Sequence, residues 1–154
     1  VVRSSCRSYN FHVDYKPTVG TDALTLITPL HDYDETASFQ LSYKARQARG
    51  SGDNGLREEV RRYTYSKGRA VVFGSDFEHS TEPGAGRNGQ LHAYLCFTFG
   101  TDQQHRWPEI SRTLETQSRV VVHPNGEMRL TRLGMELERM VAEHASQSAI
   151  SDHA

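Results

Sequence analysis

The sequence has no long hydrophobic run, only two cysteines and no excess charge of either sign. Its apolar stretches fall well short of the roughly 20 residues that span a bilayer, and no signal-peptide pattern is present, so we expect no membrane partner. Cys6 and Cys96 are too few for a disulfide scaffold, which favours a reducing, cytoplasmic location; a single bridge between them stays an open alternative. The net charge of −1 argues against nucleic acid as a partner.

A chain of 154 residues is long enough for one domain with a moderate core. The hydrophobic fraction of 36% is low for a compact domain, so we expect long polar loops. The first residue is Val1, not methionine, which is what an excised domain or a processed product would show.

Short β-branched and aromatic segments, separated by Gly- and Pro-containing turns, predict an all-β core. A charged excursion, with a short helix at 56–62, is expected over 44–62, and an amphipathic helix over 132–145. Asn125-Gly126 predicts a type I′ turn in a C-terminal hairpin. The expected strands are residues 9–15, 24–30, 37–43, 63–65, 70–73, 91–99, 120–124 and 127–131.

The segment 91–99 has the clearest alternation in the chain. One face carries Leu91, Ala93, Leu95, Phe97 and Phe99, and the other carries His92, Tyr94, Cys96 and Thr98. In a closed sheet that encloses a site, the more polar face lines that site. Cys96, within this apolar pattern, is expected to be a small buried thiol.

His12, Asp14 and His79 form the candidate catalytic and metal-binding group. On a strand, residues i and i+2 point to the same face, so His12 and Asp14 are expected to converge. His79 follows the apolar segment 70–73. Two imidazoles and one carboxylate, with the other coordination positions open, form the facial triad of non-haem Fe(II) oxygenases.

The order of these elements resembles the Fe(II)- and 2-oxoglutarate-dependent dioxygenase superfamily, in particular its prolyl-hydroxylase-like branch. The resemblance runs over about residues 9–100 and rests on His12-Val13-Asp14, the segment 24–30, Gly68-Arg69-Ala70-Val71-Val72-Phe73, His79 and the strand 91–99. It implies a double-stranded β-helix, or jelly roll, within a single domain 1–154 whose residues 101–154 are a C-terminal extension with a hairpin and helix. The supporting region that usually precedes this core in the family is absent, as in an excised domain.

The resemblance also implies an activity and its cofactors. His12, Asp14 and His79 would bind Fe(II), with 2-oxoglutarate and O2 as cosubstrates and ascorbate as an auxiliary reductant. The reaction would hydroxylate a C–H bond of a protein side chain or a small molecule, so the partner is a peptide or small-molecule substrate.

One position departs from the family pattern. An Arg or Lys usually opens the strand after the distal histidine and binds the far carboxylate of 2-oxoglutarate, because a permanent cation suits it. Here His92 occupies that place, and Arg87 lies in the preceding loop. The candidates for binding the cosubstrate are therefore Arg87 or a protonated His92, helped by Tyr94 or Thr25.

Other interpretations of the same residues stay open. His12 and His79 could be structural histidines, Asp14 a turn residue, and Thr25 and Tyr94 simple strand formers. The chain could then be a non-catalytic jelly-roll binding domain that has lost 2-oxoglutarate binding. A cupin-like metal enzyme is a third class, but no further histidine lies close to His12, where cupins gather theirs.

Overall fold

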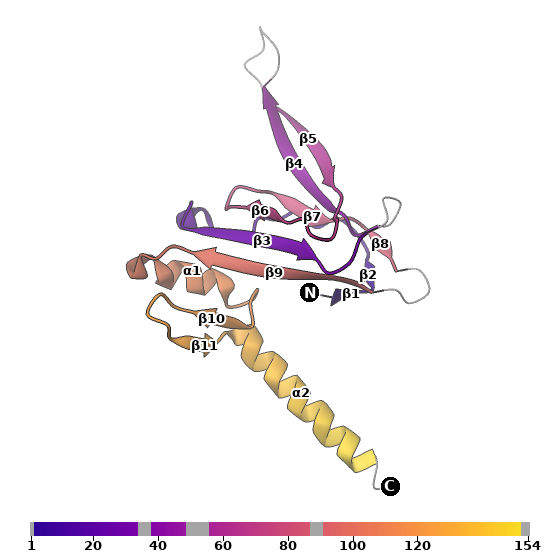
Figure 1. The fold of residues 1–154 in the computed structure, drawn as a ribbon, viewed down its shortest axis with the longest axis vertical. Coiled ribbons are helices and arrows are strands. Elements are labelled where there is room, and N and C mark those ends of the chain that lie inside the picture. The colour runs from indigo at the N-terminus through magenta and orange to yellow at the C-terminus, as the bar shows by residue number, and fades with distance from the viewer. Residues whose placement is uncertain (1, 34–37, 49–55, 87–90, 152–154) are drawn as a thin grey trace. The chain divides into compact units, whose positions relative to one another are not determined.

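The computed structural model describes residues 2–33, 38–48, 56–86 and 91–151 (Figure 1). The chain divides into two compact units, Val1–Phe99 and Gly100–Ala154, called here the N-terminal unit and the C-terminal unit. Among the described residues, no helix has the length and apolar character needed to cross a membrane.

The N-terminal unit is built almost entirely of antiparallel strands, which confirms the all-β core. Its strands form a four-stranded sheet in the order β1-β9-β3-β6, a three-stranded sheet in the order β5-β4-β7, and the pair β2-β8. A 3₁₀ turn, η1, spans Pro17–Val19. The strands are β1 Val2–Arg3, β2 Ser5–Cys6, β3 Ala23–Pro29, β4 Leu41–Ala48, β5 Leu56–Tyr63, β6 Val71–Phe73, β7 His79–Thr81, β8 Gly84–Ala85 and β9 His92–Gly100.

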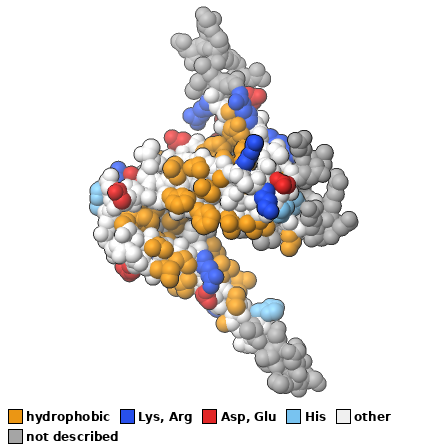
Figure 2. Space-filling model, viewed as in Figure 1, with side chains coloured by type: hydrophobic (Ala, Val, Ile, Leu, Met, Phe, Trp, Pro, Cys, Tyr) orange, Lys and Arg blue, Asp and Glu red, His pale blue; other side chains and the backbone are white. Residues whose placement is uncertain are grey.

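The inner face of the four-stranded sheet carries both polar and apolar side chains. Thr25 of β3 and His92 of β9 are buried on it, as are Ile27 and Phe73, whereas Leu24 and Leu91 are exposed. Figure 2 shows hydrophobic side chains gathered over these strands. The exposed apolar residues of the outer face are Leu24, Val72, Leu95, Phe97 and Phe99. The expectation that the polar side of β9 lines the interior therefore agrees with the burial of His92.

The two cysteines are both free thiols, so the structure contains no bridge between them. The expectation of a buried Cys96 is wrong, because this residue is exposed on β9. Cys96 lies on the same side of the strand as Tyr94 and Thr98, since residues two apart share a face. That side of β9 is consequently open to solvent near its middle.

Strands β4 and β5 form a long antiparallel hairpin, which projects from the N-terminal unit in Figure 1. The short helix expected over 56–62 is therefore wrong. The charges come together across the strands: Lys44 Nζ lies 3.2 Å from a carboxylate oxygen of Glu58 and 2.7 Å from one of Glu78. Glu78 precedes β7, so this contact ties the hairpin to the strand that carries His79.

The strand expected over 37–43 is displaced toward the C-terminus. β4 begins at Leu41, and Phe39 has a left-handed backbone with φ of 72°. Phe39, Gln40, Leu41 and Ser42 are all buried, so the expected wet face is absent there. A core cluster surrounds Phe39 and contains Ile27, Tyr33, Leu41, Tyr65 and Phe73.

The C-terminal unit packs a short helix, a hairpin and a long helix. Its elements are η3 Gln104–Arg106, α1 Trp107–Leu114, β10 Val120–Val122, β11 Met128–Leu130 and α2 Arg132–Ser151. Trp107 anchors the start of the unit: its indole Nε1 donates to the carbonyl of Thr101 at 2.8 Å. A Cβ on Gly100 would lie 2.7 Å from the same ring, so this position requires glycine.

The hairpin β10-β11 is present, but the expected type I′ turn is wrong. The amide of Gly126 donates to the carbonyl of His123 at 2.8 Å, which makes Pro124 and Asn125 the central residues. Proline fixes φ near −65°, whereas a type I′ turn requires positive φ at both central positions. The positive φ of 84° falls on Gly126 instead, as in a type I turn followed by a left-handed residue.

Gly134→Ala is expected to destabilise the C-terminal unit by about 1–3 kcal/mol through overpacking. In an unhindered helix the same change is worth roughly 1 kcal/mol in the opposite direction. Here the added Cβ would lie 2.1 Å from the carbonyl oxygen of Arg119, so the backbone must move. Urea unfolding followed by Trp107 fluorescence measures the effect. Met135→Ala, at an exposed position on the same helix, is the control, and an unchanged or raised midpoint for Gly134→Ala would contradict the argument.

Candidate metal centre

The two histidines are held side by side by the backbone. The amide of His12 donates to the carbonyl of His79 at 3.0 Å, and the amide of His79 donates to the carbonyl of His12 at 2.9 Å. This antiparallel bridge places both side chains on one face. The strand expected over 9–15 is wrong, because His12 is its one paired residue among those described. Asp14 reaches the site through a bend just before η1 instead.

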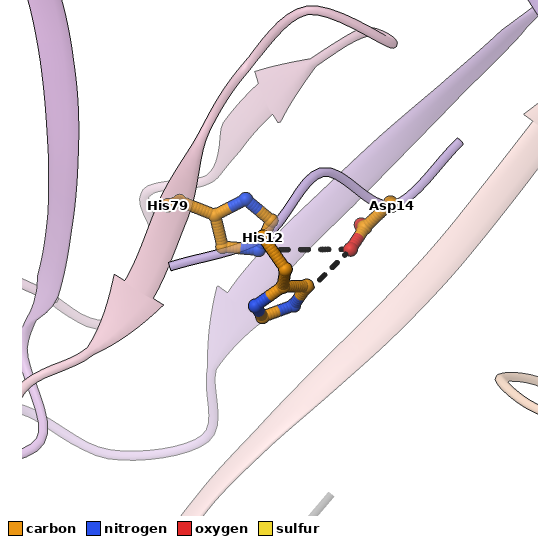
Figure 3. A group of neighbouring side chains, drawn as sticks. All are labelled: His12, Asp14 and His79. Atoms are coloured by element: carbon orange, nitrogen blue, oxygen red, sulfur yellow. Dashed lines mark ion pairs between the residues drawn. The ribbon is translucent and has the colours of Figure 1, made fainter. Parts of the chain in front are cut away.

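The three side chains point toward one another, as Figure 3 shows. The Nε2 atoms of His12 and His79 each lie 3.7 Å from Oδ1 of Asp14, and the candidate ligand atoms all lie within 4.8 Å of one another. These separations are too long for hydrogen bonds. Donors that share one ion through bonds of about 2.1 Å are roughly 3.0–3.4 Å apart, so small side-chain rotations would bring the three atoms to bonding distance.

Both imidazoles present the correct nitrogen to the centre. Nδ1 of His12 lies 2.7 Å from the carbonyl oxygen of Asn10, and Nδ1 of His79 lies 3.0 Å from that of Phe77. A carbonyl can only accept, so each Nδ1 must carry the proton. Each Nε2 then offers a lone pair, which is the tautomer that a metal-binding histidine needs.

The carboxylate of Asp14 is oriented by a buried chain of hydroxyls. Thr25 Oγ1 donates to Asp14 Oδ2 at 2.9 Å, and the hydroxyl of Tyr15 lies 2.7 Å from Thr25 Oγ1. Because the threonine proton is committed to Asp14, the tyrosine is the donor in the second bond. Thr25 and Tyr15 are almost completely buried. The arrangement occupies Oδ2 and leaves Oδ1 directed at the two imidazoles.

The site is buried on one side and open on the other. His79 is 6% exposed and packs against the rings of Phe73 and Phe77, with centroids 4.7 and 5.6 Å away. Burial lowers the pKa of His79, and this outweighs the opposing effects of the Phe77 carbonyl and Asp14. The neutral imidazole that ligates metals is thus favoured. The side chain of His12 is 49% exposed, so solvent reaches the centre from its side.

Thr25→Val is expected to weaken metal binding by roughly 10- to 100-fold, the usual effect of losing an outer-shell partner. Valine matches the shape of threonine but leaves Asp14 Oδ2 and the Tyr15 hydroxyl without this bond. Calorimetric titration with Mn(II) measures the change. Thr28→Val on the same strand removes a hydroxyl that donates to the Arg69 carbonyl at 2.9 Å and is the matched control. Equal affinities for the two variants would contradict a positioning role for Thr25.

The four residues expected to bind the cosubstrate differ from one another in their contacts; they are Thr25, Arg87, His92 and Tyr94. Thr25 contacts Asp14, as described. Tyr94 makes its side-chain hydrogen bond with Arg3, a residue to which the sequence analysis gave no role. Arg87 lies outside the described residues.

His92 is 4% exposed and lies among aromatic rings. The ring centroids of Phe39 and Tyr33 are 4.3 and 4.8 Å away, and that of His31 is 5.9 Å away. Burial lowers the pKa of His92, and the charge of His31 lowers it further. The protonated form that could bind a carboxylate is therefore disfavoured.

A hollow of about 280 Å³ adjoins the segment that carries the candidate ligands. Its lining includes Val13 and Glu78, which are the chain neighbours of these ligands. The hollow also presents charges of both signs, from Lys44 and Arg46 and from Glu58 and Asp76.

Comparison of the chain with models of protein families, with curated proteins and with solved structures finds no match. The geometry of this chain is therefore the basis on which its function is inferred. Within the part of the chain that the structure describes, His12, Asp14 and His79 are the one group of three such side chains that could hold a metal ion.

Proposed function

We propose that the protein is an Fe(II)- and 2-oxoglutarate-dependent dioxygenase. The observation that carries this proposal is the geometry of His12, Asp14 and His79: two Nε2 lone pairs and one carboxylate oxygen face a common point from one side. This donor set suits Fe(II) with open coordination positions. An accidental cluster would not need the outer contacts that orient every one of the three ligands.

The sheet arrangement supports a jelly roll around this centre. His79 belongs to β7 of the three-stranded sheet, and Thr25 belongs to β3 of the four-stranded sheet. Both side chains contact or approach the Asp14 carboxylate. The proposed centre therefore lies where the two sheets approach one another, as in a double-stranded β-helix with an interior site.

When bound, Fe(II) and 2-oxoglutarate would supply the oxidising chemistry: O2 oxidises the substrate C–H bond to C–OH, while 2-oxoglutarate becomes succinate and CO2. The protein contributes geometry. His12, Asp14 and His79 would hold the ion from one side, and the opposite side would be left for cosubstrates. The buried rings around His79 exclude water from one flank.

The substrate would approach from the exposed side of His12. The neighbouring hollow is lined by Lys44 and Arg46 together with acidic side chains. A surface with both signs of charge suits a polar small molecule or a peptide side chain better than an apolar substrate. The proposed reaction is thus hydroxylation of a C–H bond in such a molecule.

The test is an anaerobic titration of the protein with Fe(II) and 2-oxoglutarate. We expect the weak visible charge-transfer band of the chelated cosubstrate, and its loss in His12→Ala. His105→Ala is a control at an exposed histidine of the C-terminal unit. A band that survives in His12→Ala would overturn the ligand assignment.

A second candidate function is a non-catalytic binding domain with the same fold. The observation in its favour is the buried His92, with its lowered pKa, at the position where the resemblance calls for a permanent cation. Release of succinate from 2-oxoglutarate in the presence of Fe(II) and O2 separates the two. An oxygenase produces succinate even without its substrate, whereas the binding domain produces none.

A further inference from the structure

A second hollow, of about 520 Å³, lies wholly within the C-terminal unit. Helix α1 lines it with Trp107, Pro108 and Ser111, and the β10-β11 hairpin lines it with His123 and Glu127. Its size is within the usual range of ligand-binding sites, about 300–1,000 Å³. None of the candidate metal ligands borders this hollow, so a ligand bound here would serve a role separate from the proposed reaction.

The hydroxyl of Ser111 is buried and has no hydrogen-bond partner among the described residues. The side chain is 6% exposed. A helical serine can donate to the carbonyl four residues earlier, here that of Trp107, but the structure has no such bond. Buried polar groups normally have partners, so the missing one requires an explanation. Because Ser111 lines the hollow, an N–H donor bound there would supply it.

The charged side chains that line the hollow leave one carboxylate without a counterion. Arg129 donates to Glu115 at 2.6 Å, and Arg112 pairs with Glu109 at 2.8 Å. Each of these two cations therefore has a carboxylate of its own. Among the residues that the structure describes, none forms an ion pair or a hydrogen bond with the exposed carboxylate of Glu127. The uncompensated charge of the lining is consequently negative.

Ring surfaces line the same hollow as this carboxylate. The ring centroids of Trp107 and His123 are 5.4 Å apart, and Pro108 follows Trp107 at the start of α1. The indole Nε1 already donates to the carbonyl of Thr101, so Trp107 offers a ligand its ring surface and not its donor. Aromatic faces attract cations, tryptophan most strongly. The lining thus suits a flat cation.

Side-chain amides border the hollow as well. Gln104 and Asn125 both line it, and an amide side chain can pair with the N–H and C=O groups of a peptide backbone. Oδ1 of Asn125 accepts the backbone amide of Glu127 at 3.0 Å, which leaves the NH₂ group of Asn125 for a carbonyl oxygen. A cationic side chain presented by a peptide therefore matches more of the lining than a free cation does.

We propose that this hollow binds an arginine side chain of a peptide partner. The guanidinium would donate paired hydrogen bonds to Glu127, lie against the ring of Trp107 and direct a further N–H toward Ser111. Arginine suits these features better than lysine, because its guanidinium is planar, carries five donors in a fixed arrangement and is more weakly hydrated. The inference uses no residue of the candidate metal centre and goes beyond the proposed function.

The experiment titrates the metal-free full chain with three short peptides. Acetyl-Ala-Arg-Ala-amide carries the cation, its citrulline analogue has nearly the same shape without the charge, and its glutamate analogue has the opposite charge. The chain has one tryptophan, so its indole N–H gives one nuclear magnetic resonance signal, from the lining of the hollow. We expect a saturable shift with the arginine peptide and binding of the citrulline peptide that is about 3- to 30-fold weaker.

Glu127→Gln should remove the preference for arginine over citrulline, because it keeps the shape of the side chain and removes its charge. Glu136→Gln, at an exposed carboxylate of α2 outside the hollow, is the matched control and should behave like the wild type. Equal binding of the two peptides by the wild-type chain would overturn the proposal, as would an unaltered preference in Glu127→Gln. Tighter binding of the glutamate peptide would overturn it too, since Arg112 and Arg129 would then define the site.

Ser111→Ala separates a binding role from a structural one. It should weaken binding of the arginine peptide, while the urea midpoint stays the same or rises, because the lost hydroxyl has no partner in the free protein. Unchanged peptide binding in this variant would contradict the contact assigned to Ser111. A wild-type chain that binds no metal ion would overturn the proposed function but not this inference, since the titration needs neither metal nor 2-oxoglutarate.

Discussion

His79→Ala is expected to lower the affinity for Mn(II) well beyond the roughly 10- to 100-fold that loss of an outer-shell partner causes. The variant keeps His12 and Asp14 but removes the one ligand that is both buried and fixed as a neutral imidazole. Two remaining donors, one of them half-exposed, cannot define the proposed facial site. Titration of Mn(II), followed by electron paramagnetic resonance of the free ion, measures the loss.

His92→Ala is the matched control for this experiment. His92 is as deeply buried as His79 and also packs against a phenylalanine ring, that of Phe39 at 4.3 Å. It makes no contact with the candidate ligands that the structure shows. Its removal should disturb packing to a similar degree while leaving Mn(II) binding intact. Parallel losses in the two variants would mean that general destabilisation, and not coordination, explains the result for His79.

Phe39→Ala is expected to destabilise the N-terminal unit by about 3–5 kcal/mol, the usual cost of removing a buried phenylalanine. The side chain is 3% exposed and belongs to the core cluster. Its φ of 72° adds a second effect, since the left-handed region costs an L-residue about 1–2 kcal/mol. Glycine avoids that cost. Phe39→Gly should therefore be more stable than Phe39→Ala by about 1 kcal/mol, the reverse of the usual order.

The chain provides separate probes for this measurement. All seven tyrosines lie within Val1–Phe99, and the single tryptophan, Trp107, lies in the C-terminal unit. Tyrosine circular dichroism during urea unfolding should show a lower midpoint for both variants, while Trp107 fluorescence reports the other unit. A glycine variant less stable than the alanine variant would contradict the role assigned to the backbone conformation.

The sequence predicts those strands whose two faces differ in polarity. The segments 24–30 and 91–99 correspond to β3 and β9 within one residue at each end. In β3, buried and less buried residues alternate as the sequence does. In β9 the residue types alternate but the burial does not, because Leu95, Cys96 and Phe97 are all exposed. The hairpin around Pro124 is also predicted. Its turn type was not predicted, because the sequence does not show which two residues are central. Asn125-Gly126 as the centre permits a type I′ turn, whereas the observed centre at Pro124-Asn125 excludes it.

The hairpin β4-β5 could not be recognised by the same signal. Its described outer portion has solvent on both faces, so charged residues occupy positions on either side and no apolar alternation arises. Its stability comes from strand pairing and contacts such as that of Lys44 with Glu58, which depend on a register the sequence does not display. The short helix α1 did leave a signal, with Trp107, Ile110 and Leu114 at helical spacing and Pro108 in its first turn.

The sequence predicted some parts of the candidate site and not others. His12, Asp14 and His79 could be grouped because a local spacing and an ordered series of elements connected them, and the structure brings them together. The strand argument for Asp14 was wrong, since the residue reaches the centre through a bend. The pairing of Arg3 with His92 gave no signal, because the two residues lie almost 90 positions apart in the chain. Long-range pairing of a two-residue strand has no local pattern.

The carbonyl contacts of the two Nδ1 atoms have a consequence for which ion the candidate centre would hold. Two unconstrained neutral imidazoles have four combinations of tautomers, and in about one of the four both Nε2 atoms carry lone pairs. Metal binding would then cost about 0.8 kcal/mol to select that combination. The carbonyl contacts in this fold remove that cost. The benefit is the same for every divalent ion that accepts two nitrogens and an oxygen. Zinc and copper should then bind more tightly than ferrous iron, following the general order of affinities. Occupancy by iron would be decided by supply in the cell, and protein purified in air should contain whichever competitor was abundant.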